Sequence, residues 1–256
     1  MALLLGLSTS ACRNAPGADH LTVFAAASLS EPFSALADSM KQRHPGLRID
    51  FNFAGSQILA LQLTRGASAD VFASADQNWM KVIGDSGLVE GQPAVFANNR
   101  LVVIVPASNP ARIQRLQDLA RAKVKLVLAG ETVPIGHYAR ESLARVGGSP
   151  GFPAEYQAKV LANLVSNEES VKGVVTKVQL GEADAGIVYS SDVTPKVSAK
   201  VIRIEIPDEQ NVRASYPIAQ LRRAANPALA REFVELVLSS VGQRVFLAAG
   251  FLPPSV

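Results

Sequence analysis

The chain has 256 residues, of which 48% are hydrophobic and 18% are charged, and this composition is that of a globular protein rather than a disordered one. Its net charge is +3, with 25 Lys and Arg against 22 Asp and Glu, spread along the chain without a basic run. Because binding to a phosphate backbone needs clustered cations, we expect no nucleic-acid partner.

The first 20 residues predict a leader followed by a tether. A short apolar run, "MALLLGL", precedes small polar residues and Cys12, the only cysteine. This order is similar to a bacterial lipoprotein signal, in which cleavage before the cysteine leaves that residue to carry lipid. We therefore expect export, with Cys12 as the lipidation candidate. The alternative is a plain cleaved signal in which Cys12 is lost or inert.

From His20 onward, strand and helix patterns alternate. A strand ends in "FAAAS" and leads into a helix that stops before "HPG". "LRIDFNF" then alternates apolar and polar side chains, which is the period-two signature of a strand, and further helices flank the strand "ADVFAS". Such alternation predicts a mostly parallel sheet covered by helices.

A second series follows the hydrophobic strand "LVVIVP". It contains the strands "KVKLVLAG" and "ADAGIVYS", and two more strands and two helices finish the chain. We expect two α/β lobes joined by two crossings, near residues 99–105 and 201–207. The predicted division is 1–20 as leader and tether, 21–100 with 206–256 as the first lobe, and 101–205 as the second lobe.

Five residues lie where a predicted strand ends and a helix begins, or at the rim of a sheet. In open α/β sheets, ligands bind beyond the carboxyl ends of the strands. Helix starts leave backbone N–H groups without partners, so several that converge can hold an anion without a cationic side chain, and hydroxyl groups add further donors. The five residues are Ser28, Ser56, Ile135, Val171 and Tyr189.

Each of these residues also has a purely structural interpretation. Ser28 with Glu31 fits a capping box, and Ser56 is an ordinary N-cap residue. The other three would suit core or rim positions in almost any sheet. The prediction of a binding site therefore depends on the five positions occurring together.

Seven sequence blocks, in order, resemble the periplasmic molybdate-binding proteins, which are the solute receptors of molybdate ABC transporters. The resemblance implies the type II periplasmic binding fold, in which two lobes close over the oxyanion. It also implies a periplasmic monomer that delivers its ligand to an ABC transporter permease in the inner membrane, with no enzymatic activity and no cofactor. The blocks, which extend from about Leu21 to Pro253, are "FAAASL", "ADVFASADQNWM", "LVVIVP", "VPIGHYARESL", "ESVKG", "AGIVYSSD" and "GFLP".

The resemblance further implies a role for each of the five positions. Family members hold the tetrahedral oxyanion through two serines in one lobe, and through two backbone N–H groups and a tyrosine hydroxyl in the other. By motif, Ser28 and Ser56 are the serines. Ile135 and Val171 would donate backbone N–H groups, and Tyr189 its hydroxyl. The molybdenum would then have no direct protein ligand.

The chain departs from the family pattern beside two of these positions. Gly55 stands where relatives tend to have another serine, which leaves open which atoms of Gly55 and Ser56 donate. Ser170 replaces an acidic residue that commonly precedes the valine, which changes the charge near the site without removing a donor.

A pocket made only of donors selects among oxyanions. Molybdate at neutral pH is a dianion without a proton, whereas hydrogen phosphate brings a proton that needs an acceptor. Tungstate is nearly the same size as molybdate, and sulfate has the same charge and shape but shorter bonds. We expect molybdate and tungstate to bind, sulfate to bind much more weakly and phosphate negligibly. A receptor of the same fold for sulfate is the alternative.

An enzyme, in the form of a serine hydrolase, is the competing functional class. It would need a histidine base, and the three histidines are His20 in the tether region, His44 at the far end of a helix and His137 at a helix start. No G-x-S-x-G motif is present, so we expect no enzymatic activity. The single Trp79 gives little material for stacking on a sugar and is expected to pack its helix on the sheet.

Overall fold

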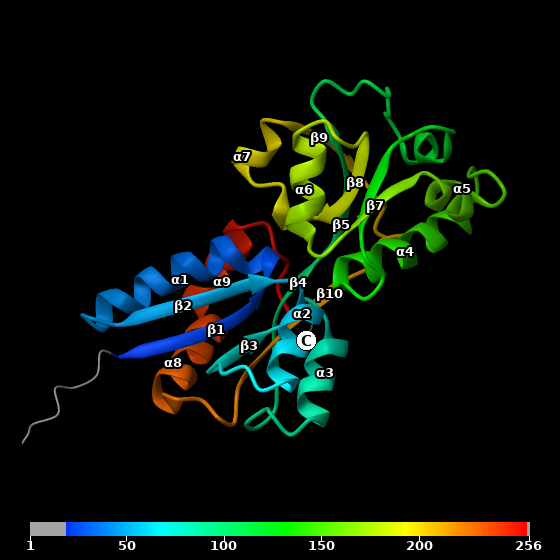
Figure 1. Ribbon diagram of the computed structural model, residues 1–256. Coiled ribbons are helices and arrows are strands. Elements are labelled where there is room, and N and C mark those ends of the chain that lie inside the picture. The colour runs from blue at the N-terminus through cyan, green and yellow to red at the C-terminus, as the bar shows by residue number, and fades with distance from the viewer. Residues whose placement is uncertain (1–18, 255–256) are drawn as a thin grey trace, which may run out of the picture.

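The computed structural model describes residues 19–254 and consists of two α/β lobes (Figure 1). The lipidation candidate Cys12 lies outside the described residues. Within the described range, every helix is too short or too polar to cross a membrane.

The first lobe is built on a five-stranded sheet with the strand order β2-β1-β3-β10-β4. β1, β2 and β3 run parallel, and β10 runs antiparallel to both of its neighbours. The strands are β1 His20–Ala26, β2 Arg48–Ala54, β3 Val71–Ala73, β4 Ala94–Asn99 and β10 Ala214–Gln220. The helices of this lobe are η1 Ala27–Leu29, α1 Ser30–Arg43, α2 Ser56–Thr64, α3 Gln77–Asp85, α8 Pro227–Leu238 and α9 Ser240–Ala248.

The second lobe repeats this arrangement with the strand order β7-β6-β8-β5-β9. β6, β7 and β8 run parallel, while β5 runs antiparallel to β8 and β9. The strands are β5 Leu101–Pro106, β6 Leu126–Ala129, β7 Leu164–Glu168, β8 Ala185–Tyr189 and β9 Val201–Glu205. The helices are η2 Leu116–Ala120, α4 Pro134–Gly147, α5 Tyr156–Ala162, α6 Val171–Gln179, η3 Ser190–Asp192 and α7 Pro195–Ser198.

The central strands of both sheets are buried, as their sequences predict, whereas the edge strands β2, β7 and β9 are partly exposed. β5 and β8 are buried along their whole length, because each lies between two other strands of the sheet and helices such as α6 pack on its face. In the first lobe a cluster of aromatic rings joins α1, α8 and α9 to the sheet. Phe33 packs edge-on against Phe233 at 5.3 Å between ring centroids, and Phe96 of β4 lies 4.9 Å from Phe246. Such pairs stabilise beyond their buried area alone.

The prediction of two α/β lobes is confirmed, but the prediction of mostly parallel sheets is only partly right. Three strands in each sheet are parallel, and the remaining two form antiparallel pairs where the chain passes between lobes. The chain changes sheet between Asn99 and Leu101, and again after Glu205. The exact lobe limits at residues 100 and 205 stay a prediction.

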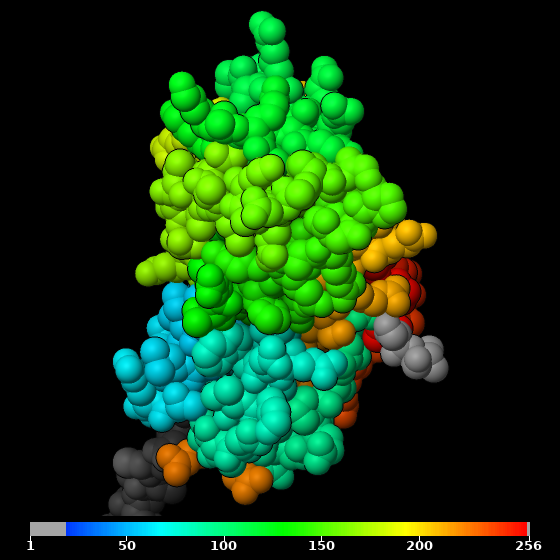
Figure 2. Space-filling view, turned by 90° about the vertical axis from the view of Figure 1, so that its right-hand side faces the viewer, coloured from blue at the N-terminus to red at the C-terminus, as the bar shows by residue number. Residues whose placement is uncertain are grey.

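The two lobes touch along a seam, seen in Figure 2 where the green second lobe rests on the cyan part of the first. Gln57 Nε2 donates to the carbonyl oxygen of Glu169 at 2.8 Å. Trp79 Nε1 donates to the carbonyl oxygen of Thr132 at 2.9 Å. As predicted, Trp79 packs its helix on the core of the first lobe, but its indole N–H also reaches the other lobe.

Candidate functional site

A small cavity lies where the two lobes meet. It is lined at the carboxyl ends of β1 and β2 from the first lobe and of β6, β7 and β8 from the second. Apart from five residues with predicted roles, its lining consists of alanine, glycine, valine, proline and one serine, so no charged side chain lines it within residues 19–254. The structure brings all five predicted residues to this cavity: Ser28, Ser56, Ile135, Val171 and Tyr189.

Ser28 lies in η1, directly after β1, and is 3% exposed. The alternative interpretation of Ser28 as part of a capping box is wrong, because α1 begins only at Ser30 and its N-cap residue is Leu29, without a side-chain cap. The Ser28 hydroxyl instead lies 3.1 Å from the hydroxyl of Tyr216 on β10. No local pattern in the sequence marks Tyr216 as a neighbour, since 188 residues separate the two.

Ser56 is the first residue of α2 and is 1% exposed. It does not cap this helix, because β2 ends at Ala54 and the extended Gly55 is the N-cap residue. Its Oγ accepts the backbone N–H of Ala75, in the loop after β3, at 3.0 Å. With this acceptor position filled, the hydroxyl hydrogen of Ser56 remains available for the cavity.

Gly55 has a steric reason to be glycine in this arrangement of the lobes. A Cβ atom at this position would collide with the carbonyl oxygen of Glu169 in the second lobe. The departure from serine at Gly55 therefore allows close approach of the two lobes at the edge of the cavity.

Ile135 is the second residue of α4 and contributes its backbone. Pro134 occupies the first helical position, where its missing N–H is not needed, and the first intrahelical bond runs from the His137 N–H to the Val133 carbonyl. The N–H of Ile135 precedes that bond and has no intrahelical acceptor. Gly136 lets the helix start pack on the end of β6, since a Cβ there would overlap the carbonyl oxygen of Gly130.

Val171 is the first residue of α6, and it also presents a backbone N–H at a helix start. The preceding Ser170 is extended, with φ −155° and ψ 166°, and makes no side-chain cap. The apolar side chain of Val171 is buried in the core of the second lobe. The Val171 side chain thus packs in the core, while its backbone N–H lies at a helix start that lines the cavity.

Tyr189 ends β8 and is 1% exposed. Its buried hydroxyl makes no hydrogen bond of standard geometry within residues 19–254, although its ring lies 5.7 Å from that of Tyr216. Burial, followed by the neighbouring tyrosines and carboxylates, raises the pKa of Tyr189 well above its ordinary value. The group therefore stays protonated and remains a donor at any physiological pH.

Charged groups lie just behind the cavity wall and link the lobes. Lys172 Nζ, next to Val171, lies 3.1 Å from Glu31 Oε2 in the first lobe and 3.4 Å from Asp192 Oδ1 in the second. The Asp192 side chain is fully buried, and this burial raises its pKa to about 6, against the opposing effect of Lys172. The positive charge of Lys172 thus lies between one carboxylate of each lobe, Glu31 and Asp192.

Neither a histidine base nor a metal site accompanies the serines. His20 pairs with Asp50 and His44 with Glu232, while His137 is exposed on α4. Among residues 19–254, no group of three or more His, Cys, Asp or Glu side chains could hold a metal ion. The polar groups at the cavity are hydroxyls and N–H groups at helix starts, which suit hydrogen-bond donation to an anion.

Comparisons with known proteins agree with this geometry. The family described as bacterial extracellular solute-binding protein matches residues 21–252. The molybdate-binding protein ModA of Mycobacterium tuberculosis (strain ATCC 25618 / H37Rv) is 41% identical over 238 residues, which cover 93% of this chain and 86% of that protein.

Two solved structures resemble the fold. The substrate binding domain of a putative molybdenum ABC transporter from Clostridium difficile has a TM-score of 0.67 at 29% identity, covering 92% of this chain and 99% of that one. The sulfate-binding protein SubI from Mycobacterium tuberculosis H37Rv has a TM-score of 0.80 at 16% identity, covering 92% and 87%, and this likeness shows the fold alone. The predicted periplasmic binding fold is confirmed, and the hydrolase alternative is set aside because the family binds solutes. The chain belongs to the bacterial extracellular solute-binding proteins and, within them, to the molybdate-binding protein family.

Proposed function

We propose that the protein binds molybdate in the cavity between its lobes. The observation that carries this proposal is the Tyr189 hydroxyl, which is buried at the cavity and makes no hydrogen bond of standard geometry among the described residues, although it lies near the Tyr216 hydroxyl. A buried, unsatisfied polar group destabilises a fold by about 1–3 kcal/mol, so its retention at a cavity favours a bound acceptor.

The five donors would then divide the oxygens of the ligand between the lobes. Ser28 and Ser56 would donate their hydroxyl hydrogens from one side, and the N–H groups of Ile135 and Val171 with the Tyr189 hydroxyl from the other. The partial positive charge of the α4 and α6 helix starts would favour the dianion further. The molybdenum atom would touch no protein atom directly.

Selectivity would follow from the donor-only lining. A proton on hydrogen phosphate would meet no charged acceptor among the lining residues, which supports the expectation that phosphate binds negligibly. Tungstate would bind like molybdate, because the two ions are nearly the same size. Sulfate would bind much more weakly, since its shorter bonds leave the donors too far apart. A sulfate receptor remains the second candidate, since a sulfate-binding protein shares the fold.

The ligand would act by shifting the lobes toward the closed form. Bound oxyanion would bridge two half-sites that neither lobe completes alone, and the seam contacts of Gln57 and Trp79 would form with it. The closed monomer would deliver its ligand to an ABC transporter permease in the inner membrane. We further propose a periplasmic location, with Cys12 as a candidate lipid anchor, and lobe limits near residues 100 and 205.

Calorimetric titration of the purified protein with molybdate, tungstate, sulfate and phosphate tests this proposal. We expect one site per chain, micromolar or tighter binding of molybdate and tungstate, much weaker sulfate and no phosphate binding. Because Trp79 is the only tryptophan, its fluorescence reports closure, and it should change with molybdate and not with phosphate. No heat with molybdate, or tighter binding of sulfate than of molybdate, would contradict the proposal.

A further inference from the structure

Tyr216 lies behind the cavity and is itself absent from the lining residues. It is completely buried on β10, and its hydroxyl lies 3.1 Å from the Oγ of Ser28. Its ring meets Tyr189 at 5.7 Å and Phe251 at 5.3 Å between ring centroids, both edge-on. These contacts on two sides fix the ring, so its hydroxyl is held at a defined place next to Ser28.

A side-chain amide lies near the Tyr216 hydroxyl. Asn99, the last residue of β4, accepts the Arg100 N–H at its Oδ1 and donates from Nδ2 to Ser191 Oγ at 2.8 Å. The side chains of Asn99 and Tyr189 both lie close enough to the Tyr216 hydroxyl to oppose the rise in its pKa. The Asn99 amide nitrogen has a second hydrogen, which it can donate to the Tyr216 hydroxyl oxygen, and the hydrogen of Tyr216 can then go to Ser28.

A bound anion would require the Tyr216 hydroxyl to donate its hydrogen to Ser28. An oxyanion offers only acceptors, so Ser28 contributes to binding only if its single hydroxyl hydrogen points into the cavity. If Ser28 donated to Tyr216 instead, it would face the anion with lone pairs. Ser56 has the corresponding arrangement, because its Oγ accepts the Ala75 N–H and so keeps its hydrogen free.

We propose that Tyr216 is a positioning residue, whose hydroxyl donates to Ser28 and thereby turns the Ser28 hydrogen toward the oxyanion. Donation runs from Asn99 through Tyr216 and Ser28 to the ligand. This inference rests on the proposed function, since it assigns a role toward the same bound anion. Tyr216 stays protonated in this role, because burial raises its pKa well above the ordinary value.

A double-mutant cycle with molybdate titration tests the proposal. Tyr216→Phe keeps the ring and removes the hydroxyl, so we expect a roughly 5-fold loss of affinity in the otherwise unchanged chain. In the Ser28→Ala background the same substitution should change affinity by less than about 2-fold, because the group it positions is gone. Equal losses in both backgrounds would overturn the proposal, since they would mean that Tyr216 acts only through general packing.

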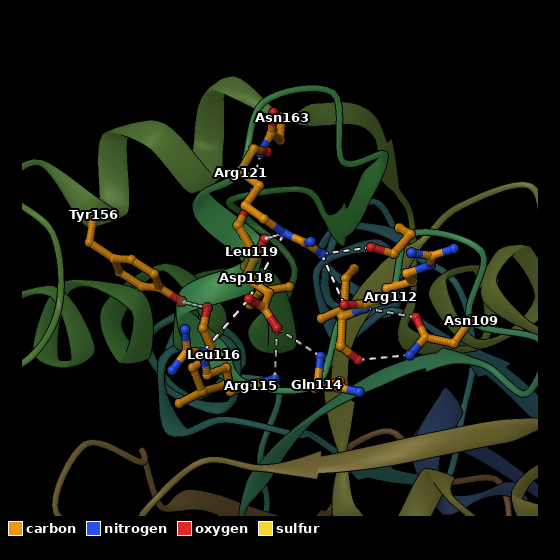
Figure 3. Close-up of polar contacts among 12 residues, drawn as sticks. Asn109, Arg112, Gln114, Arg115, Leu116, Asp118, Leu119, Arg121, Tyr156 and Asn163 are labelled. Carbon is orange, nitrogen blue, oxygen red and sulfur yellow. Dashed lines mark hydrogen bonds and ion pairs between the residues drawn. The ribbon is translucent and has the colours of Figure 1, made fainter.

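Tyr156→Phe is the matched control, since it removes another buried tyrosine hydroxyl that is hydrogen bonded in the second lobe. Its hydroxyl donates to the carbonyl oxygen of Leu116 at 2.6 Å, near η2 and away from the cavity lining (Figure 3). We expect this variant to lower the thermal midpoint as Tyr216→Phe does, but to leave molybdate affinity unchanged. A comparable affinity loss in Tyr156→Phe would overturn the assignment to Tyr216.

Two outcomes separate this inference from the proposed function. An unaltered chain that does not bind molybdate contradicts the proposed function, whereas normal binding that Tyr216→Phe leaves intact contradicts only the role of Tyr216. If Tyr216→Phe does not fold, Asn99→Ala tests the same relay from its other end. We then expect a smaller affinity loss that again disappears in the Ser28→Ala background, and a loss that persists there would overturn the proposal.

Discussion

The two lobes line the same cavity with different kinds of polar group. The first lobe contributes the side-chain hydroxyls of Ser28 and Ser56, and each is held from behind by a second group, Tyr216 or the Ala75 N–H. The second lobe brings to the cavity the starts of α4 and α6, whose first N–H groups have no intrahelical acceptor, together with the hydroxyl of Tyr189. A half-site of hydroxyls is encoded by particular residues, whereas a half-site of N–H groups is encoded by where helices begin.

The largest expected effect is a change in stability with pH caused by Asp192, which lies behind the half-site of the second lobe. Burial raises the pKa of Asp192 from its ordinary 3.8 to about 6, while Lys172 at 3.4 Å opposes this and Glu31 adds to it. The folded chain therefore holds this proton more tightly than the unfolded chain does. The resulting stabilisation is fully present below about pH 4 and is lost as the pH rises through about 6.

Urea denaturation of the unaltered chain and of Asp192→Asn measures this effect. Relative to the variant, the free energy of unfolding of the unaltered chain should fall by roughly 2.5 kcal/mol between pH 4 and pH 7. Asp118→Asn is a control of opposite sign. Although burial opposes it, hydrogen bonds from the N–H groups of Gln114 and Arg115 lower the pKa of Asp118, so its stabilisation is lost at low pH (Figure 3). A constant Asp192 difference across this range would contradict the assignment.

The next prediction tests whether Val171 contributes to binding through its backbone N–H or through its side chain. Val171→Pro removes one N–H at the first position of a helix, where proline is favoured, and the extended Ser170 before it suits a following proline. Losing a hydrogen bond to a charged ligand should weaken molybdate binding roughly 30-fold, about 2 kcal/mol. Val171→Ala keeps the N–H and should leave affinity within about 2-fold.

Molybdate titration of Val171→Pro and Val171→Ala at equal ionic strength distinguishes the two possibilities. Similar losses in both would mean that the Val171 side chain, rather than its N–H, matters for binding. Circular dichroism and thermal midpoints provide the check that α6 is retained in each variant.

The first half-site should respond to side-chain deletion instead. Ser28→Ala and Ser56→Ala should each weaken molybdate binding by about 10-fold. Ser56→Ala should also lower the free energy of unfolding by about 1–2 kcal/mol, because it leaves the buried Ala75 N–H without its acceptor. Titration and urea denaturation together measure both changes, and an unchanged affinity in either variant would remove that serine from the site.

The smallest expected effect lies in the ion pair that joins the lobes. Glu31 is about half exposed, so its pair with Lys172 is worth less than about 1 kcal/mol. Glu31→Gln should therefore weaken molybdate binding by about 2-fold at low salt, and the difference should vanish near 1 M salt. A loss that persists at high salt would assign Glu31 a role other than this ion pair.

The fold and the positions around the cavity could be predicted from the sequence, because both depend on local patterns. Alternating strands and helices predict the two lobes, and strand-to-helix junctions select all five predicted residues of the lining. The strands β4 and β7 and the helix α5 were not predicted, because their patterns are short or lack clear helix starts.

The partners of these residues could not be predicted, because they come from distant parts of the chain. The Ser28 to Tyr216 contact spans 188 residues and the Gln57 to Glu169 contact spans 112. The capping box was wrong for a related reason. Ser28 and Glu31 have the right spacing, but a 3-10 turn delays the start of α1 to Ser30, and spacing alone does not distinguish the two starts.

The central claim is that an oxyanion bridges a half-site of hydroxyls and a half-site of backbone N–H groups. A crystal structure grown with molybdate, measured at the molybdenum absorption edge, tests it most directly. We predict one anomalous peak in the cavity, with the ligand oxygens within hydrogen-bond distance of donors from Ser28, Ser56, Ile135, Val171 and Tyr189. A peak elsewhere, or an oxyanion held by a lysine or arginine side chain, would contradict the claim.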